Sequence, residues 1–250
     1  MSRQFVMLKA DDLGYPRERR DIASLARIAV KRIIGKPVEP RLRERRWKHF
    51  LDYVERMKIK ASLGLIAKHL EDGGSEFLAL VRMLAANKAF EIWNHGYDHL
   101  RIGTTKDGQP ICEFRGTTLE YQLEHIVKAQ FLAKHHLGTV MRSFGAPENA
   151  TDGATIIALD RIEEIKVWYF GPAGSTKMII DRVAEIERPL FRPSFGKFVE
   201  NYDETLPMLA LQVHPANWES VDFDEFDRIT EFLLARPVHF INPLEYSELR

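Results

Sequence analysis

The sequence predicts an α/β protein in which parallel strands and helices alternate to form a closed or nearly closed barrel. Three observations lead to this prediction. Short apolar runs alternate with segments of helical periodicity along almost the whole chain. The chain has 250 residues, enough for one such barrel with a substantial core. It contains no internal repeat, low-complexity tract or long Gly/Ser linker, so we expect a single domain over residues 1–250.

The first half of the chain begins with the apolar run QFVMLKA, a short buried strand that stops at the turn-forming sequence DDLGYP. Two segments of helical periodicity follow, and Gly35 closes the first of them. Apolar runs bounded by polar or turn-forming residues then alternate with a further helical pattern. The expected order is strand 4–10, helix 19–35, helix 40–57, strand 60–67, helix 75–87 and strand 89–94.

The second half begins, after a polar loop, with a long amphipathic helix that ends at Gly138. Short apolar runs after it are typical of buried strands, and the segments between several of them have helical periodicity. The expected order is helix 117–138, strand 139–147, helix 151–164, strand 165–172, strand 208–215, helix 223–235 and strand 238–243. This alternation implies crossover connections and therefore a parallel sheet.

Composition and charge exclude some classes of partner and of covalent cross-link. Lys plus Arg and Asp plus Glu both total 36, so no overall charge attracts nucleic acid or an anionic membrane. Two basic runs, 17–20 and 41–48, are either solvated helix faces or a site for phosphate or an anionic saccharide. A lone cysteine, Cys112, rules out an intramolecular disulfide. We see no signal peptide or transmembrane segment and expect a cytoplasmic protein; nothing indicates its oligomeric state.

Residue types that carry chemistry gather at the ends of the expected strands, where active sites form in such barrels. In chain order they are Asp11, Asp12, His95, His99, Glu148 and His214. One aspartate and the two histidines of NHGYDH together offer three oxygen and nitrogen ligands, a set that suits catalytic zinc and leaves coordination positions open. The other aspartate can take a proton from water, and the last histidine can protonate a departing amine.

Each of these residues also has a plainer interpretation when it is considered alone. The Asp11–Asp12 pair is typical of a turn or a helix cap. Histidines such as His95 and His99 are common in turns and on surfaces, and His214 is an ordinary residue for a strand end. The metal-site hypothesis therefore depends on distant segments meeting at one end of the barrel.

Three segments resemble motifs of the polysaccharide deacetylase family, also called the NodB-homology or carbohydrate esterase family 4 domain. LKADDLG is similar to the first motif, T-F-D-D-G. FEIWNHGYDH is similar to the second, in which E-I-G-N-H is followed by three residues and another His, with Trp93 in place of Gly. LALQVHP is similar to the fifth, a strand ending in L-x-H, and HFINPLEY matches the last strand. The order is right, and the resemblance spans nearly the whole chain.

This resemblance implies a divergent family member with a distorted (β/α)7 barrel. It implies that Asp12, His95 and His99 bind a divalent metal ion, with zinc expected, that Asp11 is the general base, and that His214 is the general acid. The implied reaction is hydrolysis of an N-acyl group, expected to be N-acetyl, from an amino sugar. A precursor or component of a surface polysaccharide such as an O-antigen fits the expected location.

Two family motifs are incomplete. The third is usually R-x-P-x-G, and its arginine orients the catalytic aspartate; the corresponding segment here is FGAPEN, with Gly145 in place of that arginine. Arg142, or Arg192 from the look-alike FRPSFG, is a candidate substitute. The fourth is represented by VWYFGP, which has Trp168 but lacks the acidic residues before it, and core packing is the favoured interpretation of Trp168.

The expected substrate contacts are Glu148, Trp218 and Arg192, of which Trp218 is a candidate for stacking on a sugar face although burial is an equal alternative. Two other functions remain open. A catalytically silent barrel that binds saccharide or metal fits the missing arginine. A YdjC-like sugar deacetylase is suggested by KADDLG, which is similar to the N-A-D-D-F-G opening of that family, but its further histidine motifs are not visible.

Overall fold

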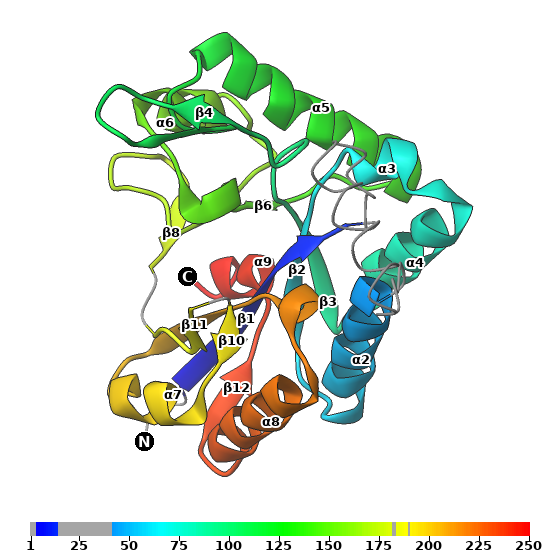
Figure 1. Ribbon diagram of the computed structural model, residues 1–250, viewed down its shortest axis with the longest axis vertical. Coiled ribbons are helices and arrows are strands. Elements are labelled where there is room, and N and C mark those ends of the chain that lie inside the picture. Colours follow the sequence, from blue (N-terminus) through cyan, green and yellow to red (C-terminus); the bar gives the residue numbers. More distant parts are fainter. Residues whose placement is uncertain (1–3, 15–41, 182–183, 190) are drawn as a thin grey trace, which may run out of the picture.

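The computed structural model describes residues 4–14, 42–181, 184–189 and 191–250 (Figure 1). The expected helix 19–35 and the basic run 17–20 lie outside these residues. The second basic run falls largely on helix α2 (Leu42–Arg56), where Arg46 donates a hydrogen bond to the carbonyl of Ala216 and Lys48 forms an exposed ion pair with Asp52.

Within the described residues the main sheet has eight strands, and every pairing in it is parallel. Seven follow one another in the order β11-β1-β2-β3-β6-β7-β8, and β12 pairs with the start of β1. The strands are β1 (Gln4–Leu13), β2 (Ala61–Leu65), β3 (Phe90–Asn94), β6 (Ser143–Phe144), β7 (Val167–Tyr169), β8 (Met178–Ile180), β11 (Met208–Val213) and β12 (Val238–Phe240).

The sheet curls until its two ends nearly meet. Beyond β8, the backbone of Ala184 forms a parallel bridge with Leu211 of β11, at the opposite end of the strand order. The fold is therefore a nearly closed barrel of seven parallel strands surrounded by helices, as the sequence predicts. Because both faces of a parallel sheet are covered, its strands are almost continuously apolar, and all five residues of β2 are buried.

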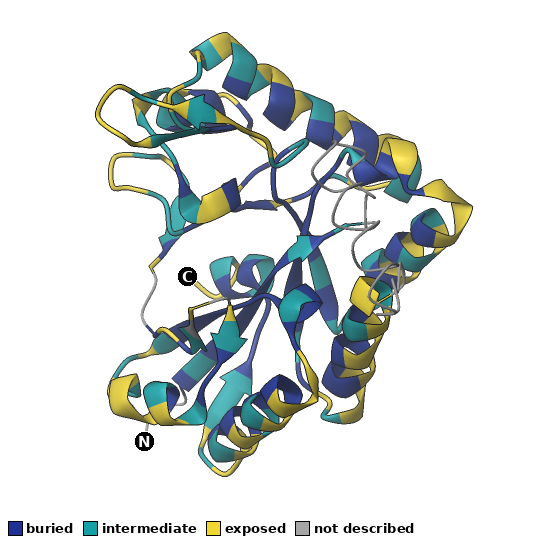
Figure 2. Cartoon of the chain, in the orientation of Figure 1, coloured by how far each residue is buried: buried dark blue, intermediate teal, exposed yellow. Residues whose placement is uncertain are grey.

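Helices cover the outside of the barrel, with their buried residues toward the strands and their exposed residues outward (Figure 2). The long helix α5 begins at Thr118, whose hydroxyl accepts a hydrogen bond from the Tyr121 N–H, and ends at Gly138, which has a left-handed φ of 72°. The other α-helices of the described ranges are α2, α3 (His69–Asp72), α4 (Gly74–Ala86), α6 (Gly153–Asp160), α7 (Phe195–Asn201), α8 (Ser220–Leu234) and α9 (Pro243–Ser247).

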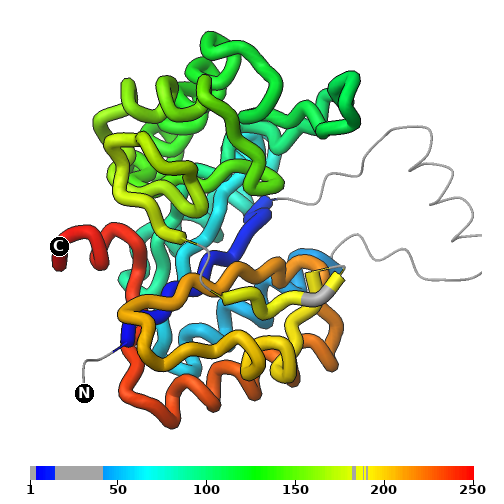
Figure 3. The backbone as a smooth tube through the Cα atoms, turned by 90° about the vertical axis from the view of Figure 1, so that its left-hand side faces the viewer, coloured from blue at the N-terminus to red at the C-terminus, as the bar shows by residue number. Residues whose placement is uncertain are grey.

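Strand β1 lies in the middle of the molecule, with later parts of the chain on both sides of it. Figure 3 shows the green segments that include α5 above it and the yellow-to-red segments that include α7 and α8 below it. None of the helices in the described ranges has both the length and the apolar character that a membrane span requires.

The short strands differ most from what the sequence predicts. The strand expected over 139–147 is only the two-residue β6, and two small antiparallel hairpins were not expected at all. The hairpins are β4 (Arg101–Thr104) with β5 (Pro110–Cys112), and β9 (Glu187–Arg188) with β10 (Arg192–Pro193). Strands of two to four residues are too short to show a period, and β4 is largely exposed.

Candidate active site

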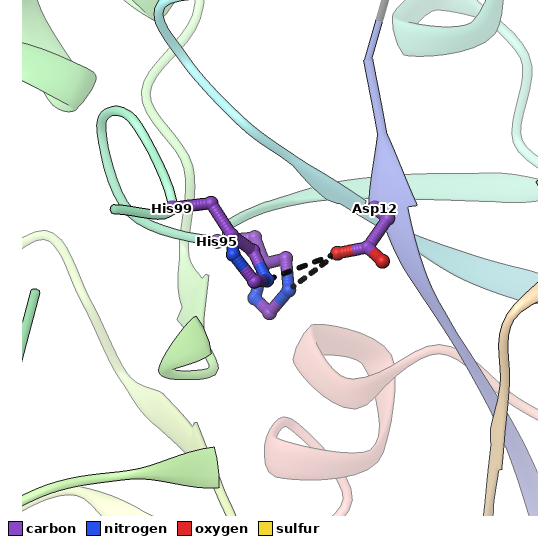
Figure 4. A group of neighbouring side chains, drawn as sticks. All are labelled: Asp12, His95 and His99. Atoms are coloured by element: carbon purple, nitrogen blue, oxygen red, sulfur yellow. Dashed lines mark ion pairs between the residues drawn. The ribbon is translucent and has the colours of Figure 1, made fainter. Parts of the chain in front are cut away.

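Both aspartates of the candidate site are on β1, close to its C-terminal end. The pairing of β1 with β2 shifts register between Ala10 and Leu13, and Asp12, inside this irregularity, has a left-handed φ of 65°. Such a conformation is uncommon for a residue other than glycine, although aspartate tolerates it better than most. A bulge of this kind re-aims a side chain. The side chain of Asp12 points toward His95 and His99, which follow β3 (Figure 4).

The atoms of these three side chains converge closely. Asp12 Oδ1 is 3.3 Å from His95 Nε2 and 3.2 Å from His99 Nε2. Oδ1 is buried, and none of the described residues is aligned to donate a hydrogen bond to it. Ligands about 2.0 Å from a tetrahedral zinc ion stand about 3.3 Å apart. The donor types and the spacing therefore both fit a zinc ion held by Asp12, His95 and His99.

Charge interactions at this cluster are strong. Burial by itself would raise the pKa of Asp12, but the two neighbouring imidazoles lower that pKa well below its usual value. Burial by itself would lower the pKa of His99, but the carboxylate of Asp12 outweighs it and raises that pKa to about 9. A cluster that perturbs the pKa of its members in this way is typical of a functional site.

His95 is oriented by a neighbouring strand. Its Nδ1 lies 2.7 Å from the carbonyl oxygen of Gly145, just after β6, so this nitrogen carries the proton and donates the hydrogen bond. The other ring nitrogen, Nε2, then presents its lone pair toward Asp12 and His99. Backbone carbonyl partners of this kind fix the tautomer and ring orientation of metal-binding histidines.

The loop between the two histidines is held by Glu113, a buried acid after β5 that sequence reasoning missed. Its carboxylate accepts hydrogen bonds from the backbone N–H of Tyr97 at 2.5 Å and of His99 at 2.8 Å. His125 Nδ1 lies 2.9 Å from the same carboxylate. Gly96, with a φ of 77°, is required here, because a Cβ atom would lie 2.5 Å from Glu113 Oε2. The only sequence signal for Glu113 is an acid inside the otherwise apolar run ICEF.

Asp98, Glu113 and His125 form a second group of potential metal ligands. Both oxygens of Glu113 already accept backbone hydrogen bonds from the histidine loop. Asp98 accepts a hydrogen bond from the N–H of Leu100. We therefore interpret this group as the support of the loop that carries His99.

The proposed base, Asp11, is almost completely buried beside the cluster of Asp12, His95 and His99. Lys9 Nζ lies 2.7 Å and 2.6 Å from its two carboxylate oxygens, and Gln212 Nε2 donates to Oδ2 at 2.6 Å. Asn149 donates to Gln212 Oε1, so the amide nitrogen of Gln212 faces Asp11. Burial would raise the pKa of Asp11, but Lys9, His95 and His214 together lower it. Asp11 is therefore a carboxylate at neutral pH.

Among the described residues the cation that contacts Asp11 is Lys9, and neither candidate arginine, Arg142 or Arg192, takes this place. Arg142 is exposed. The guanidinium of Arg192 forms ion pairs with Asp222 at 3.0 Å and Glu219 at 3.2 Å, at the start of α8. A contact between Arg192 and substrate stays a prediction.

The proposed acid, His214, follows β11 and faces Asp11, with 3.7 Å between His214 Nε2 and Asp11 Oδ2. Glu187 in β9 holds the other side of the ring, because its carboxylate lies 2.7 Å from Nδ1 and accepts the backbone N–H of His214 at 2.8 Å. Burial would lower the pKa of His214, but Glu187 and Asp11 raise it. Glu187 is thus the acidic partner of His214, and sequence reasoning missed it.

The two tryptophans considered in the sequence are both core residues. Trp218 is fully buried, donates a hydrogen bond from Nε1 to the carbonyl of Phe191, and packs against Phe50 and Phe226. The expectation that it stacks on a sugar is therefore wrong, since neither ring face is accessible. Trp168 is also fully buried.

Glu148 lies in an exposed turn after β6 and has a left-handed φ of 56°. Its carboxylate is 3.4 Å from Cys112 Sγ, which donates to it. The side chain thus stays accessible at the edge of the sheet where the other candidate residues lie. Its contact with substrate stays a prediction.

Comparison with known proteins supports the fold. The sequence matches no family profile and no curated protein, but solved structures are similar. A family 4 acetyl xylan esterase from Clostridium thermocellum, in complex with a cobalt ion, has a TM-score of 0.63 at 14% identity, covering 98% of this chain and 91% of its own. A putative polysaccharide deacetylase from Mycobacterium smegmatis has a TM-score of 0.65 at 12% identity, covering 99% and 90%.

A family 4 pseudoenzyme from Bacillus anthracis is similar as well, with a TM-score of 0.58 at 12% identity, over 93% of this chain and 61% of its own. Enzymes and a pseudoenzyme therefore share this architecture, and likeness at such low identity concerns the fold. The resemblance seen in the motifs is confirmed at that level: this chain has the fold of the family 4 carbohydrate esterases, the polysaccharide deacetylases, in a divergent form.

Proposed function

We propose that this protein is a metal-dependent hydrolase that removes an N-acyl group, expected to be N-acetyl, from an amino sugar. One observation carries the proposal: ligand atoms of Asp12, His95 and His99 lie within 4.8 Å of one another at the C-terminal ends of the strands, beside the buried Asp11. Asp12 lies on β1 and His95 follows β3, and β2 lies between these two strands, so it is the barrel fold that brings the two side chains together.

Asp12, His95 and His99 would hold the ion, and zinc is the ion that this donor set favours. When bound, the metal would polarise the acyl carbonyl and make water a stronger nucleophile at neutral pH. Three ligands from the protein leave positions open for substrate and water, which distinguishes such a site from a closed structural one.

Proton transfer would be divided between Asp11 and His214. The lowered pKa of Asp11 keeps it ionised, as a base requires, and Lys9 and Gln212 fix its orientation. The raised pKa of His214 favours the imidazolium, which can donate a proton from Nε2 to the departing amine. Glu187 keeps Nε2 turned toward Asp11 by binding Nδ1.

The proposed substrate class is supported by the names of similar structures. Similar structures include an acetyl xylan esterase and a peptidoglycan deacetylase from Bacillus subtilis. Both names refer to an acetyl group and to a glycan polymer. For this chain we propose an acetylated amino sugar in a precursor or component of a surface polysaccharide such as an O-antigen. Glu148 and Arg192 remain the proposed substrate contacts.

A second candidate function is that of a catalytically silent barrel that binds saccharide or metal. The observations in its favour are Gly145, which replaces the arginine of the third motif, and the pseudoenzyme that has the same fold. Deacetylation is favoured here because Asp11 and His214 are both present, paired and oriented.

The test combines metal analysis with acetate release. We expect one zinc ion per chain in the wild type and none in Asp12→Ala or His95→Ala, whereas Asp11→Asn keeps the ion and loses turnover. His135→Ala, at an exposed histidine on α5, is the control and should change neither property. The substrate panel should include nucleotide-linked, lipid-linked and oligomeric N-acetyl sugars. Full zinc occupancy in His95→Ala would refute the ligand assignment.

A further inference from the structure

We propose that Lys9 is the positioning residue that holds the carboxylate of Asp11 in orientation for proton transfer, and that it has replaced a cation contributed by the segment after β6. The inference rests on the proposed function, because it concerns how the base of that reaction is held. It adds a role for a residue that the motif comparison does not assign.

The ion pair between Lys9 and Asp11 is short and buried. Lys9 Nζ lies 2.7 Å and 2.6 Å from the two oxygens of Asp11, and the side chains are 0% and 3% exposed. Residues two apart on a strand project from the same face, so this pair is built into β1 itself. A buried carboxylate without a charged partner is strongly destabilising, so Lys9 both permits the burial of Asp11 and fixes its direction.

Aromatic rings surround the ammonium group. Lys9 Nζ lies 4.8 Å from the ring centre of Trp93, 5.1 Å from that of Phe170 and 5.7 Å from that of Tyr169. These rings stabilise the cation through their π faces and exclude water from the ion pair. The ammonium is therefore held against Asp11 and cannot swing out to a substrate, which makes it a positioning group.

The space that an arginine would need at position 145 is filled. A Cβ atom on Gly145 would lie 2.7 Å from Cζ3 of Trp93 and 3.3 Å from Cε of Lys9. A side chain at 145 and the ring of Trp93 therefore exclude each other. The tryptophan and the lysine together occupy the volume into which a longer residue at 145 would extend.

Three departures from the family motifs thus meet at one place. Lys9 stands at the Thr position of T-F-D-D-G, Trp93 at a Gly position, and Gly145 at the Arg position. Each of the three is unexplained by itself, but in the structure their atoms would compete for the same space. Lys9 thus supplies the positive charge that an arginine at position 145 supplies in the family motif, and Trp93 fills the remaining volume.

The first test removes the charge. Lys9→Met keeps the length of the side chain, and we expect zinc binding to persist while kcat falls about 100-fold, the cost of a misplaced catalytic group, with KM little changed. Lys60→Met is the matched control, because Lys60 also contacts both oxygens of a carboxylate, that of Glu245, but away from the site. Wild-type kcat in Lys9→Met would overturn the proposal.

The second test restores the family arrangement. In the triple variant Lys9→Thr, Trp93→Gly, Gly145→Arg, the arginine gains the vacated space, and we expect kcat at least tenfold above that of Lys9→Met. A folded, zinc-loaded triple variant with no such gain in kcat would refute the claim that Lys9 takes the role of an arginine at position 145.

A third measurement needs no activity. Lys9→Met should lower Tm because the buried carboxylate of Asp11 loses its ion pair and keeps only the hydrogen bond from Gln212 and the more distant His214. Adding Asp11→Asn should recover most of that loss. Additive effects of the two substitutions on Tm would overturn the pairing. If the wild type releases no acetate from any substrate, the proposed function fails, while this thermodynamic cycle still decides whether Lys9 and Asp11 are coupled.

Discussion

Replacing Glu113 by glutamine tests whether a residue outside the proposed ligand set controls the affinity of the proposed ion site. Glu113 accepts the backbone N–H groups of Tyr97 and His99, one on each oxygen. Glutamine can accept one of these hydrogen bonds, but it presents its amide N–H₂ group to the other N–H. The variant therefore loses one hydrogen bond to a charged acceptor and leaves a backbone donor unsatisfied.

The expected magnitude follows from that loss. A hydrogen bond to a charged group contributes about 1.5–3 kcal/mol, so the free energy of unfolding should fall by about 2 kcal/mol. The same hydrogen bond fixes the backbone of His99, whose ring is one of the three proposed ion ligands. If the ordered loop is required for binding, a loss of about 1.4 kcal/mol or more weakens zinc affinity at least tenfold.

The assays are urea denaturation of the metal-free protein and competitive zinc titration. The matched control is Glu71→Gln, because Glu71 also accepts a hydrogen bond from Tyr97, but from its hydroxyl and at an exposed position. It should alter both quantities only slightly. If Glu113→Gln and Glu71→Gln have equal zinc affinities, the supporting role is refuted. Binding of two ions by the wild type would instead make Glu113 a ligand.

Three further predictions concern other buried groups. Trp218→Ala should lower the free energy of unfolding by about 3–5 kcal/mol without raising the KM of the folded fraction; a raised KM would restore a substrate role. Glu187→Gln should lower the pKa of His214 and shift the alkaline limb of kcat to lower pH; an unchanged limb would contradict His214 as the acid. Burial raises the pKa of Glu91 to about 7 despite hydrogen bonds from Ser143 and Leu244. The folded protein thus binds this proton more tightly than the unfolded chain, so wild-type stability should fall as pH rises from about 5 to about 7. Glu91→Gln should make this fall smaller in urea denaturation, and an unchanged pH dependence would contradict the raised pKa.

The long helices and strands, and the closeness of Asp12, His95 and His99, could be predicted from the sequence. The apolar run before NHGYDH forms β3, and strand ends that converge in a parallel barrel bring residues 12, 95 and 99 together, although they are far apart in the chain. These features depend on strong local periodicity and on one topological rule. Neither requires knowledge of individual side-chain contacts.

The supporting residues were harder to find, and for physical reasons. Glu187 lies in a two-residue strand with no period, and only the tertiary fold places it beside His214. Trp218 is a suitable residue for sugar stacking until its burial is known. Lys9 did carry a usable signal, because a lysine within an apolar strand, two residues before an aspartate, must share a face with it.

The bulge in β1 has a consequence for how the protein can change over time. By turning Asp12 toward β3 while Asp11 faces Gln212 and His214 of the β11 side, it separates the group that would retain the ion from the groups that would move protons. Mutations on one side need not disturb the other. A lineage with this architecture can therefore lose turnover while it still captures its ion, or change its acid without rebuilding the ion site.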